Sequence, residues 1–413
     1  MTGADMLATT PMPVSFVPTP TTAAEWADAY NALGISLLER QRFEEALAAF
    51  DAALQSDSDH VYAMFNRGVV CRRLGRDADA IDAFRGAIAL EPHWWQPHLD
   101  LGLLLIRHGH LPEGWKEYEW RWQSGGPPPM RVNRPQPIWN GERCWNARRE
   151  HERRTIVLCA ESGHGDMIQF VRLAALVKPL VGRVLVEAPA RLRRLLATCP
   201  DIDGVIAGDE ACDADYQLPL LSVPHVLRLT QDAIPGRTPY LFASPSPAID
   251  QFFAPFGDRL KVGVCWTGSP SNPLNALRSC RPDDFAALST LDTDETCRLK
   301  LFSLQLITDE PLARHVDRLG ITRLDALQQD FADAASIIMC LDVVITIDTA
   351  IAHLAGALGR PVWLLLHDQP DARWMIDRTD SPWYPTMRIF RQPAGGTWAD
   401  VFAEVATALT RSI

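Results

Sequence analysis

The sequence has few lysines, no paired cysteine motif and no long apolar run. Only four of its 40 basic residues are lysines, and its 51 acidic residues give a net charge of −11. This balance argues against a general binder of nucleic acid or of anionic membranes. An anion would therefore be bound by arginine side chains or by backbone amides.

The nine cysteines include no CxxC pair and no cysteine–histidine spacing typical of a metal site. An odd, unpatterned set is typical of buried thiols in a reducing compartment. No stretch reaches 18 uninterrupted apolar residues, and the first 20 residues lack the basic start of a signal peptide. We therefore expect a cytoplasmic protein without a membrane span.

The length of 413 residues predicts two to three domains, and 47% hydrophobic residues are enough to bury real cores. We expect a disordered Thr/Pro-rich tail at 1–24, a repeat region at 25–123 and a Pro/Gly-rich linker at 124–152. The remainder predicts two α/β domains, at 153–250 and 251–413.

Three sets of positions repeat within 25–123 at a spacing of 34 residues. They are Gly34, Gly68 and Gly102; Ala46, Ala80 and Gly114; and Phe50, Phe84 and Tyr118. A 34-residue period with two small positions is typical of a helix-turn-helix solenoid, in which small residues let paired helices approach closely. These stretches resemble the tetratricopeptide repeat, and Pro92 stands where that repeat has its closing proline.

The third repeat ends in an aromatic cluster, Trp115, Tyr118, Trp120 and Trp122. A terminal repeat must cover a face that has no next repeat. One interpretation is that these rings dock the solenoid onto the domain after it in the chain. The other is a peptide-binding groove, and the two are compatible because the concave face is separate from the end.

From residue 155 onward, short apolar runs alternate with amphipathic helices. The first group of runs is TIVLCA, RVLVEA and GVIAG, and the second is KVGVCW, LKLFSLQ, DVVITID and PVWLLL. Continuous apolar runs bounded by turn residues favour strands buried on both faces of a parallel sheet. We therefore expect two adjacent doubly wound domains, separated around 240–258, with ligands beyond the carboxyl ends of the strands.

The segment TIVLCAESGHGDMIQF carries the first chemical signal. Gly163 and Gly165 allow a tight turn, and Asp166 stands where a helix begins, which favours an anion or polar-ligand site. A dinucleotide fingerprint would need a third glycine around position 168, where Ile168 stands, and this argues against a nicotinamide or flavin enzyme. From the residues alone, Asp166 is either a helix cap or a catalytic base.

The segment DVVITIDTAIAH carries the second signal. Asp348 and Thr349 open a helix, and the free amides of Thr349, Ala350 and Ile351 would point toward a ligand. His353 follows one turn later. A helix start with a hydroxyl and an imidazole suits a diphosphate, whereas the alternative for His353 is a satisfied core histidine.

Between these segments lies VGVCWTGSPSNPLNALRS, in which Thr267 and Gly268 form a polar turn after a strand. Arg278 follows, and its guanidinium suits a phosphate. Asp213 and Asp215 form an acidic D-x-D pair, but in a setting that we interpret as surface acids rather than a metal site.

Together these segments resemble glycosyltransferases of the GT-B fold, most of all bacterial heptosyltransferase-like enzymes fused to tetratricopeptide repeats. The resemblance runs from about Ile138 to the C-terminus. It rests on ESGHGDMIQF, WTGSPSNP, Arg278–Ser279, DFADAASII, IDTAIAHLAGALGRPVWLLL and SPWYPTMRIFRQ. The repeat-fused arrangement also resembles protein O-glycosyltransferases, whose solenoid recruits the polypeptide acceptor.

The resemblance implies a role for each motif residue. Asp166 would be the general base, within a loop that includes Gly163, Gly165 and Gln169. The donor's phosphates would lie against Asp348, Thr349, Ala350, His353 and Arg278. The nucleotide site would be lined by Thr267, Gly268 and Gln305.

The expected reaction is inverting, metal-independent transfer of a sugar from a nucleotide-activated donor to an acceptor hydroxyl, on a protein recruited by the repeats. Asp166 would take the proton, and helix amides with Arg278 would stabilise the leaving diphosphate. We expect no cofactor, because the nucleotide sugar is a substrate. The alternatives are a non-catalytic scaffold with a degenerate body and a heptosyltransferase acting on a lipopolysaccharide-type acceptor.

Overall fold

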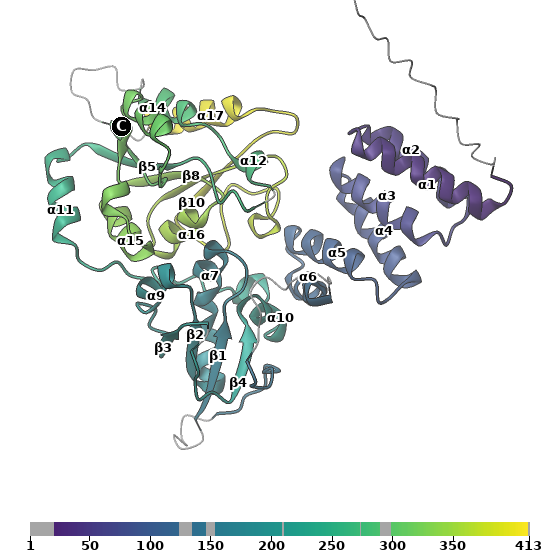
Figure 1. Cartoon of the computed structure of the whole chain (residues 1–413), viewed down its shortest axis with the longest axis horizontal. Coiled ribbons are helices and arrows are strands. Elements are labelled where there is room, and N and C mark those ends of the chain that lie inside the picture. The colour runs from purple at the N-terminus through teal and green to yellow at the C-terminus, as the bar shows by residue number, and fades with distance from the viewer. Residues whose placement is uncertain are drawn as a thin grey trace, which may run out of the picture. The chain divides into compact units, whose positions relative to one another are not determined.

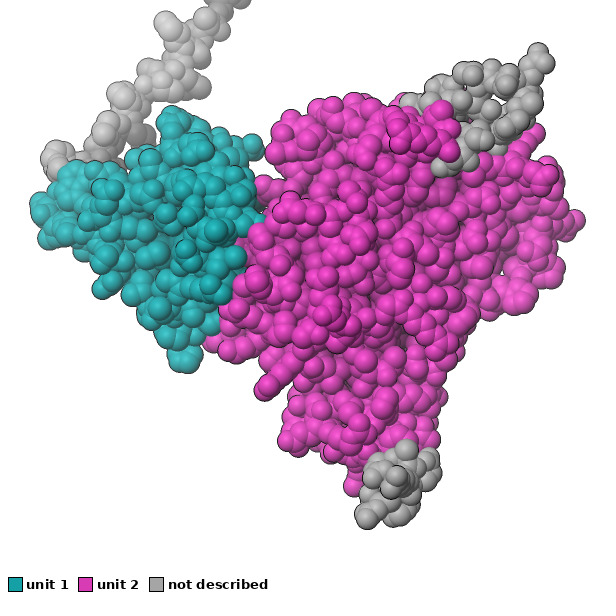
Figure 2. Space-filling model, turned by 180° about the vertical axis from the view of Figure 1, so that it is seen from behind, with its two compact units in different colours: residues 1–101 teal, residues 102–413 magenta. Residues whose placement is uncertain are grey.

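The computed structural model describes residues 20–123, 134–145, 153–208, 210–272, 274–289 and 299–411. These residues belong to two compact units, 1–101 and 102–413, which Figure 2 shows in different colours. Most of the predicted linker, and residues 1–19 of the predicted tail, lie outside the described residues.

The first unit is built from helices alone within its described residues (Figure 1). They are α1 (Ala23–Glu39), α2 (Phe43–Ser56), α3 (Val61–Arg73), α4 (Asp77–Leu90) and the start of α5 (Trp95–Arg107). The chain continues as α6 (Leu111–Tyr118) and a short 3-10 helix, η1 (Glu119–Gln123).

The 34-residue period reflects close helix crossings. A Cβ atom on Gly34 would lie 2.5 Å from a ring carbon of Phe50, and one on Gly68 would lie 2.6 Å from a ring carbon of Phe84. Each pair therefore packs an aromatic ring of its second helix onto a glycine of its first. At Gly102 the crossing helix is closer still, and a Cβ would meet backbone atoms of α6. The predicted helix pairs are confirmed.

The second unit contains two parallel sheets. The first has the strand order β3-β2-β1-β4, and the second has the order β10-β9-β8-β5-β6-β7. Their strands are β1 (Arg154–Cys159), β2 (Gly182–Glu187), β3 (Gly204–Ile206), β4 (Tyr216–Pro219), β5 (Leu260–Cys265), β6 (Leu299–Ser303), β7 (Thr322–Arg323), β8 (Val343–Ile347), β9 (Val362–Leu366) and β10 (Met387–Arg391). All named pairs are parallel. The predicted α/β body of two doubly wound sheets is confirmed.

The strand order fixes where ligands can bind. In the second sheet the direction of winding reverses between β5 and β8, and in the first it reverses between β1 and β4. Open α/β sheets bind ligands beyond the carboxyl ends of the strands at such switch points. The polar segments that follow β1, β5 and β8 all lie at these two places.

Three strands were not predicted, namely β4, β7 and β10. The sequence of β4, YQLP, is short, partly polar and ends in proline, so it lacks the apolar run by which the other strands were found. It is held by pairing with β1, with Ile156 beside Tyr216. β7 has only two residues. β10 lies at the edge of its sheet, and its run of apolar residues is interrupted by the exposed Arg388.

Helices cover both sheets (Figure 1). They are α7 (His164–Phe170), α8 (Ala174–Val181), α9 (Ala190–Leu196), α10 (Val223–Val226), α11 (Pro247–Phe253), α12 (Asn275–Arg278), α13 (Pro282–Ser289), α14 (Glu310–Arg318), α15 (Phe331–Met339), α16 (Ala350–Ala357) and α17 (Trp398–Thr410). Among the helices that the structure describes, none is long and apolar enough to cross a membrane.

The end of the repeat region is part of the core of the second unit. The ring of Trp115 on α6 packs edge-to-face on Phe170 of α7, with centroids 5.6 Å apart, and Phe170 packs on Trp383. All three side chains belong to one hydrophobic core that continues through the first sheet. Trp115 therefore packs on the domain that follows it in the chain, within the second unit.

A buried ion pair joins η1 to the loop after β1. The guanidinium of Arg121 donates to both carboxylate oxygens of Glu161, at 3.1 to 3.3 Å, and the two side chains are only 8% and 1% exposed. Glu161 also accepts from the Leu221 amide, which follows β4. The E-S-G-H-G-D loop is therefore anchored at its first residue by both the repeat region and the β4 end.

Candidate functional site

Asp166 lies in the first turn of α7, at the carboxyl end of the first sheet. Its Oδ2 atom accepts a 2.8 Å hydrogen bond from the Gly163 amide, so the side chain caps the helix. The carboxylate is 9% exposed. Gly163 itself is the N-cap residue, so Asp166 caps the helix from its third position rather than as the N-cap. The catalytic role stays a prediction, because a carboxylate that caps a helix can also have a free lone pair.

The charge of Asp166 is balanced by an arginine from the other sheet. Arg373 lies on the 3-10 helix η8 (Ala372–Trp374), after β9, and its Nη2 atom is 2.6 Å from Asp166 Oδ1. Burial by itself raises the pKa of Asp166, but Arg373 and hydrogen bonds from Ser162 and Gly163 more than offset it. The pKa therefore lies below its ordinary value, and the carboxylate is ionised at neutral pH.

The polar turn after β5 forms a compact hydrogen-bonded cluster. The Thr267 amide donates to Gln305 Oε1 at 3.2 Å, and the Gly268 amide donates to Asn275 Oδ1 at 3.0 Å. Arg278 lies over the same turn, since a Cβ on Gly268 would come within 2.3 Å of its guanidinium. The predicted nucleotide-lining residues are therefore brought together at one place.

The start of α16 lies beside this cluster. Thr349 occupies the N-cap position, but its hydroxyl contacts Thr346 at 3.3 Å and Cys265 at 4.0 Å, and no side-chain hydrogen bond caps the helix among the described residues. Ala350 is the first helical residue. The amides of this first turn are thus available for an anion, as the sequence predicted.

Asp348, which follows β8 directly, has a pKa above the ordinary value of an aspartate. Burial raises its pKa to about 6, and the nearby charges of Arg373 and Arg278 limit the rise. Its Oδ1 atom lies 3.8 Å from His353 Nε2 on α16. A carboxyl with this pKa changes its charge near neutral pH.

His353 is buried, with 2% exposure, and has partners on two sides. Its Nδ1 atom is 2.9 Å from the Tyr384 hydroxyl, and its ring stacks on Trp374 with centroids 5.1 Å apart. Burial lowers its pKa to about 3, with a further contribution from Arg373, so the imidazole is neutral. These contacts match the satisfied core histidine of the alternative interpretation, and the phosphate role stays a prediction.

The two motif helices meet face to face. A Cβ on Gly165 would lie 2.8 Å from His353 Cδ2 and 3.4 Å from the Ala350 Cα. Only glycine fits this approach, which explains the second glycine of the G-x-G-D loop. Gln169, one turn after Asp166, is fully buried, and its Oε1 atom accepts from Arg373 at 2.8 Å.

The structure thus brings every predicted site residue to the carboxyl ends of β1, β5, β6 and β8. Sequence reasoning missed Arg373, its second carboxylate partner Asp371, and the rings of Trp374 and Tyr384. Tyr384 falls inside the quoted SPWYPTMRIFRQ segment, which was the one available signal. Arg373 lies in a loop without a recognisable pattern.

The described residues contain no group of three or more His, Cys, Asp or Glu side chains that could hold a metal ion. Asp213 is exposed, and Asp215 accepts from the Thr155 amide at 2.8 Å and pairs with Arg154. Asp215 therefore binds the amino end of β1, whereas the candidate site lies at the carboxyl end of that strand.

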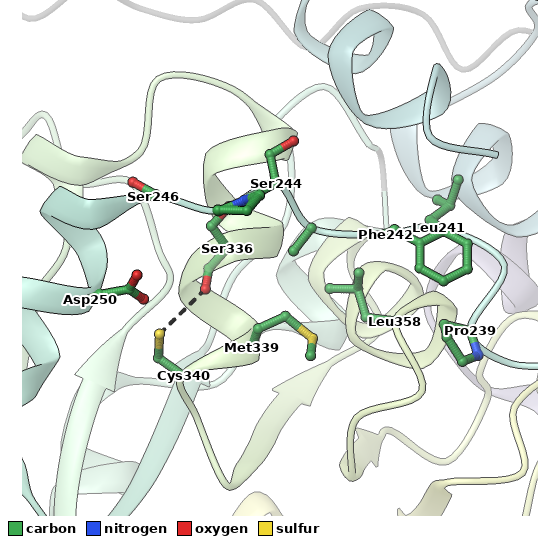
Figure 3. A pocket seen from close by; sticks show the side chains of 12 residues that line it. Pro239, Leu241, Phe242, Ser244, Ser246, Asp250, Ser336, Met339, Cys340 and Leu358 are labelled. Atoms are coloured by element: carbon green, nitrogen blue, oxygen red, sulfur yellow. Dashed lines mark hydrogen bonds between the residues drawn. The ribbon is translucent and has the colours of Figure 1, made fainter.

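A separate hollow of about 400 Å³ lies on the segment that connects the two sheets (Figure 3). Phe242 and Ser244 come from this segment, and Ser336, Met339 and Cys340 come from α15 and its end. The Ser336 hydroxyl donates to the Ser244 carbonyl at 2.7 Å. None of the predicted site residues lines this hollow.

Residues 31–93 match the family model described as tetratricopeptide repeat, and residues 282–393 match that of glycosyltransferase family 9 (heptosyltransferase). The chain is 24% identical over 444 residues to protein FlbA of Caulobacter vibrioides, covering 92% of this chain and 72% of FlbA. It is 32% identical over 83 residues to the probable UDP-N-acetylglucosamine–peptide N-acetylglucosaminyltransferase SPINDLY of Arabidopsis thaliana, which is 20% of this chain and 9% of that protein.

Among solved structures, the E. coli ADP-heptose lps heptosyltransferase II is similar over 63% of this chain and all of its own, with 17% identity and a TM-score of 0.45. The glycosyl transferase family 9 protein of Veillonella parvula covers 61% of this chain and 91% of its own, with 10% identity and a TM-score of 0.42. The family matches agree with the repeat spacing and, within 282–393, with the motif from Asp348 to His353. The chain therefore combines a tetratricopeptide repeat match at 31–93 with a glycosyltransferase family 9 (heptosyltransferase) match at 282–393.

Proposed function

We propose that the protein transfers a sugar from a nucleotide-activated donor to an acceptor hydroxyl, with inversion at the anomeric carbon and without a metal. The family 9 domain supports glycosyltransferase activity. The finer proposal rests on the groups that meet at the switch point between β5 and β8. There the polar turn at Thr267, the guanidinium of Arg278 and the uncapped start of α16 adjoin one another.

The donor's diphosphate would lie at the start of α16. The amides of Thr349 and Ala350 and the charge of Arg278 would stabilise the negative charge that develops on the leaving nucleotide. Asp348 would lie next to this anion, and its high pKa lets it become neutral there. The nucleoside would lie toward Gly268 and Gln305, beyond the end of β5.

Asp166 would act from the other side of the site. Its carboxylate accepts the proton of the acceptor hydroxyl while that oxygen bonds to the anomeric carbon and the bond from the anomeric carbon to the phosphate oxygen breaks. The proton then leaves to water. Attack from the side opposite to the leaving group inverts the anomeric configuration.

The repeats would recruit a protein acceptor. Their first helices are linked by polar pairs, since Asn66 donates to Asn31 at 2.9 Å and Arg72 pairs with Asp100. We take Asn31 and Asn66 as concave positions of the solenoid that contact the acceptor chain. Recruitment raises the local acceptor concentration and needs no catalytic residue in the repeats.

The test uses isotope-labelled nucleotide sugars and a lysate of a host strain from which the gene is deleted. The full-length protein is expected to move label into the protein fraction. Asn31→Ala with Asn66→Ala should reduce this labelling, yet leave slow donor hydrolysis unchanged. Glu44→Gln, on the exposed face of α2, is the matched control and should change neither.

Two other results would redirect the proposal. Label in the lipopolysaccharide fraction alone would identify a lipopolysaccharide-type acceptor, and the repeats would then serve another purpose. Donor binding without hydrolysis or transfer would identify a scaffold that has lost turnover.

A further inference from the structure

We propose that Arg373 is a positioning residue, which orients the Asp166 carboxylate and keeps it ionised when the two sheets meet around the substrates. This inference rests on the proposed function, because it assumes that Asp166 is the base. Arg373 itself would touch no reacting atom. It acts only through Asp166.

The guanidinium of Arg373 is fixed by three different groups. Its Nη2 atom lies 2.6 Å from Asp166 Oδ1, its Nη1 atom donates to Gln169 Oε1 at 2.8 Å, and its Nε atom lies 2.9 Å from Asp371 Oδ1. The side chain is only 16% exposed. Because the guanidinium is planar, it cannot turn away from Asp166 without losing the other contacts.

The backbone of Arg373 is held by residues of the segment between β9 and β10. Its amide donates to Asp371 at 3.0 Å, and its carbonyl accepts from the Trp383 ring nitrogen at 3.1 Å. The next residue, Trp374, is buried against His353. Arg373 thus extends from the segment between β9 and β10 to Asp166, in the loop and helix that follow β1.

The remaining hydrogen-bonding capacity of Asp166 suits a base. Oδ1 is paired with Arg373, Oδ2 accepts from the Gly163 amide, and the Ser162 side chain donates a further hydrogen bond. An ionised carboxylate has about four lone-pair positions, so a position remains for an acceptor hydroxyl. A protonated carboxyl could not take the proton, and burial favours the protonated form. Arg373 supplies the charge that prevents this.

Other titratable groups around Asp166 are few. His353 on α16 has a pKa of about 3 and Tyr118 on α6 has a pKa of about 12, so neither changes charge between pH 4.5 and about 9. Asp371, beside Arg373, has a lowered pKa, and charge repulsion from Asp166 works against that lowering. Because repulsion is mutual, the charge of Asp371 also opposes the ionisation of Asp166. Asp348 titrates near 6 and can add its own inflection to the profile. His164, two residues before Asp166 on α7, has a pKa lowered by burial and can add another.

The experiment measures the pH profile of kcat/KM for donor turnover in the full-length protein. Arg373→Gln should lower kcat and move the acid limb upward by about 1–3 pH units, because the opposing charge is gone. Arg373→Lys keeps the charge, so it should restore the position of the limb but only part of kcat. Asp371→Asn keeps the hydrogen bond to the Arg373 amide and should move the limb downward.

Two controls test whether the acid limb of the pH profile comes from Asp166. Arg378→Gln removes an arginine from the same loop whose guanidinium pairs with Asp380 instead, and it should leave the limb in place. Repeating the profiles in an Asp348→Asn background separates the titration of Asp348 from that of Asp166.

The outcomes separate this inference from the proposed function. A wild-type protein that turns over no donor refutes the proposed function, and the role of Arg373 falls with it. If the wild type turns over donor but the acid limb of the pH profile stays in place in Arg373→Gln, the positioning role alone is overturned. This holds whatever the loss of kcat. If Arg373→Gln does not fold by circular dichroism, an unmoved limb in Asp371→Asn overturns it.

Discussion

The buried Arg121–Glu161 pair allows a sharp stability prediction, because it links the 3-10 helix η1 to the loop after β1. The side chain of Glu161 is only 1% exposed. After Arg121→Met, its remaining hydrogen-bond donor among the described residues would be the Leu221 amide. Removing one partner of a buried ion pair typically costs about 3–5 kcal/mol. We expect a loss of that size at pH 7 in the unfolding of the 102–413 unit.

The same variant should lose less stability in acid. Burial raises the pKa of Glu161, and Arg121 opposes that rise. Without Arg121 the folded-state pKa rises further above the unfolded value, so the folded state binds the extra proton more tightly. Stability is then regained as the pH falls from the folded pKa toward the ordinary one, by up to about 1.4 kcal/mol per pH unit.

The assay is urea unfolding of the full chain at pH 7 and pH 5, followed by tryptophan fluorescence, with each unit fitted as its own transition. Arg281→Met is the matched control, since Arg281 is 79% exposed and its pair with Asp284 is long, at 3.7 Å. It should change stability by less than about 1 kcal/mol. A cost below about 1 kcal/mol for Arg121→Met, or a cost that is the same at both pH values, would refute the reasoning.

Three further outcomes are expected from the contacts of the repeats and of the site. Gly68→Ala should destabilise the repeat unit by about 1–3 kcal/mol in a thermal melt, because its Cβ would meet the buried Phe84 ring at 2.6 Å. Gly86→Ala, which meets the flexible Met64 side chain at 3.3 Å, should be tolerated, and equal costs would contradict the crossing argument. Titration calorimetry with a nucleotide sugar should show affinity falling by up to tenfold per pH unit above about 6, because the donor's charge raises the pKa of Asp348 and binding takes up a proton. Asp348→Asn should flatten this profile, and an unchanged slope would place the diphosphate elsewhere. Arg278→Ala and His353→Ala should weaken binding of the nucleotide diphosphate more than that of the free nucleoside, and equal losses would contradict their assignment to phosphate.

The repeat region and the buried strands could be predicted because their signals are local. The 34-residue spacing records a repeated helix crossing, and runs such as DVVITID record burial on both faces of a sheet. The motif residues could be placed because each follows a strand directly. Parallel strands of one sheet end at a common edge, so the residues after β5 and β8 had to lie close together, whereas the meeting of Asp166 after β1 with them depends on how the two sheets pack.

What could not be predicted depends on contacts between distant segments. Arg373 and Gln169 are 204 residues apart, and nothing near Arg373 in the sequence indicates that its guanidinium also meets the distant Asp166. The Arg121–Glu161 pair likewise joins residues 40 positions apart in different parts of the fold. The strand β4 is defined by its neighbour β1 rather than by its own four residues.

The central claim is that Asp166 and the β5/β8 switch point form a nucleotide-sugar-dependent transferase site. The most direct test measures nucleotide release from a panel of nucleotide sugars by mass spectrometry, for the wild type and for Asp166→Asn, alongside donor binding by calorimetry. We expect release with at least one donor, and a loss of about 10²–10⁴-fold in Asp166→Asn with binding largely kept. Release by Asp166→Asn at the wild-type rate would contradict the claim and leave Asp166 as a helix cap alone.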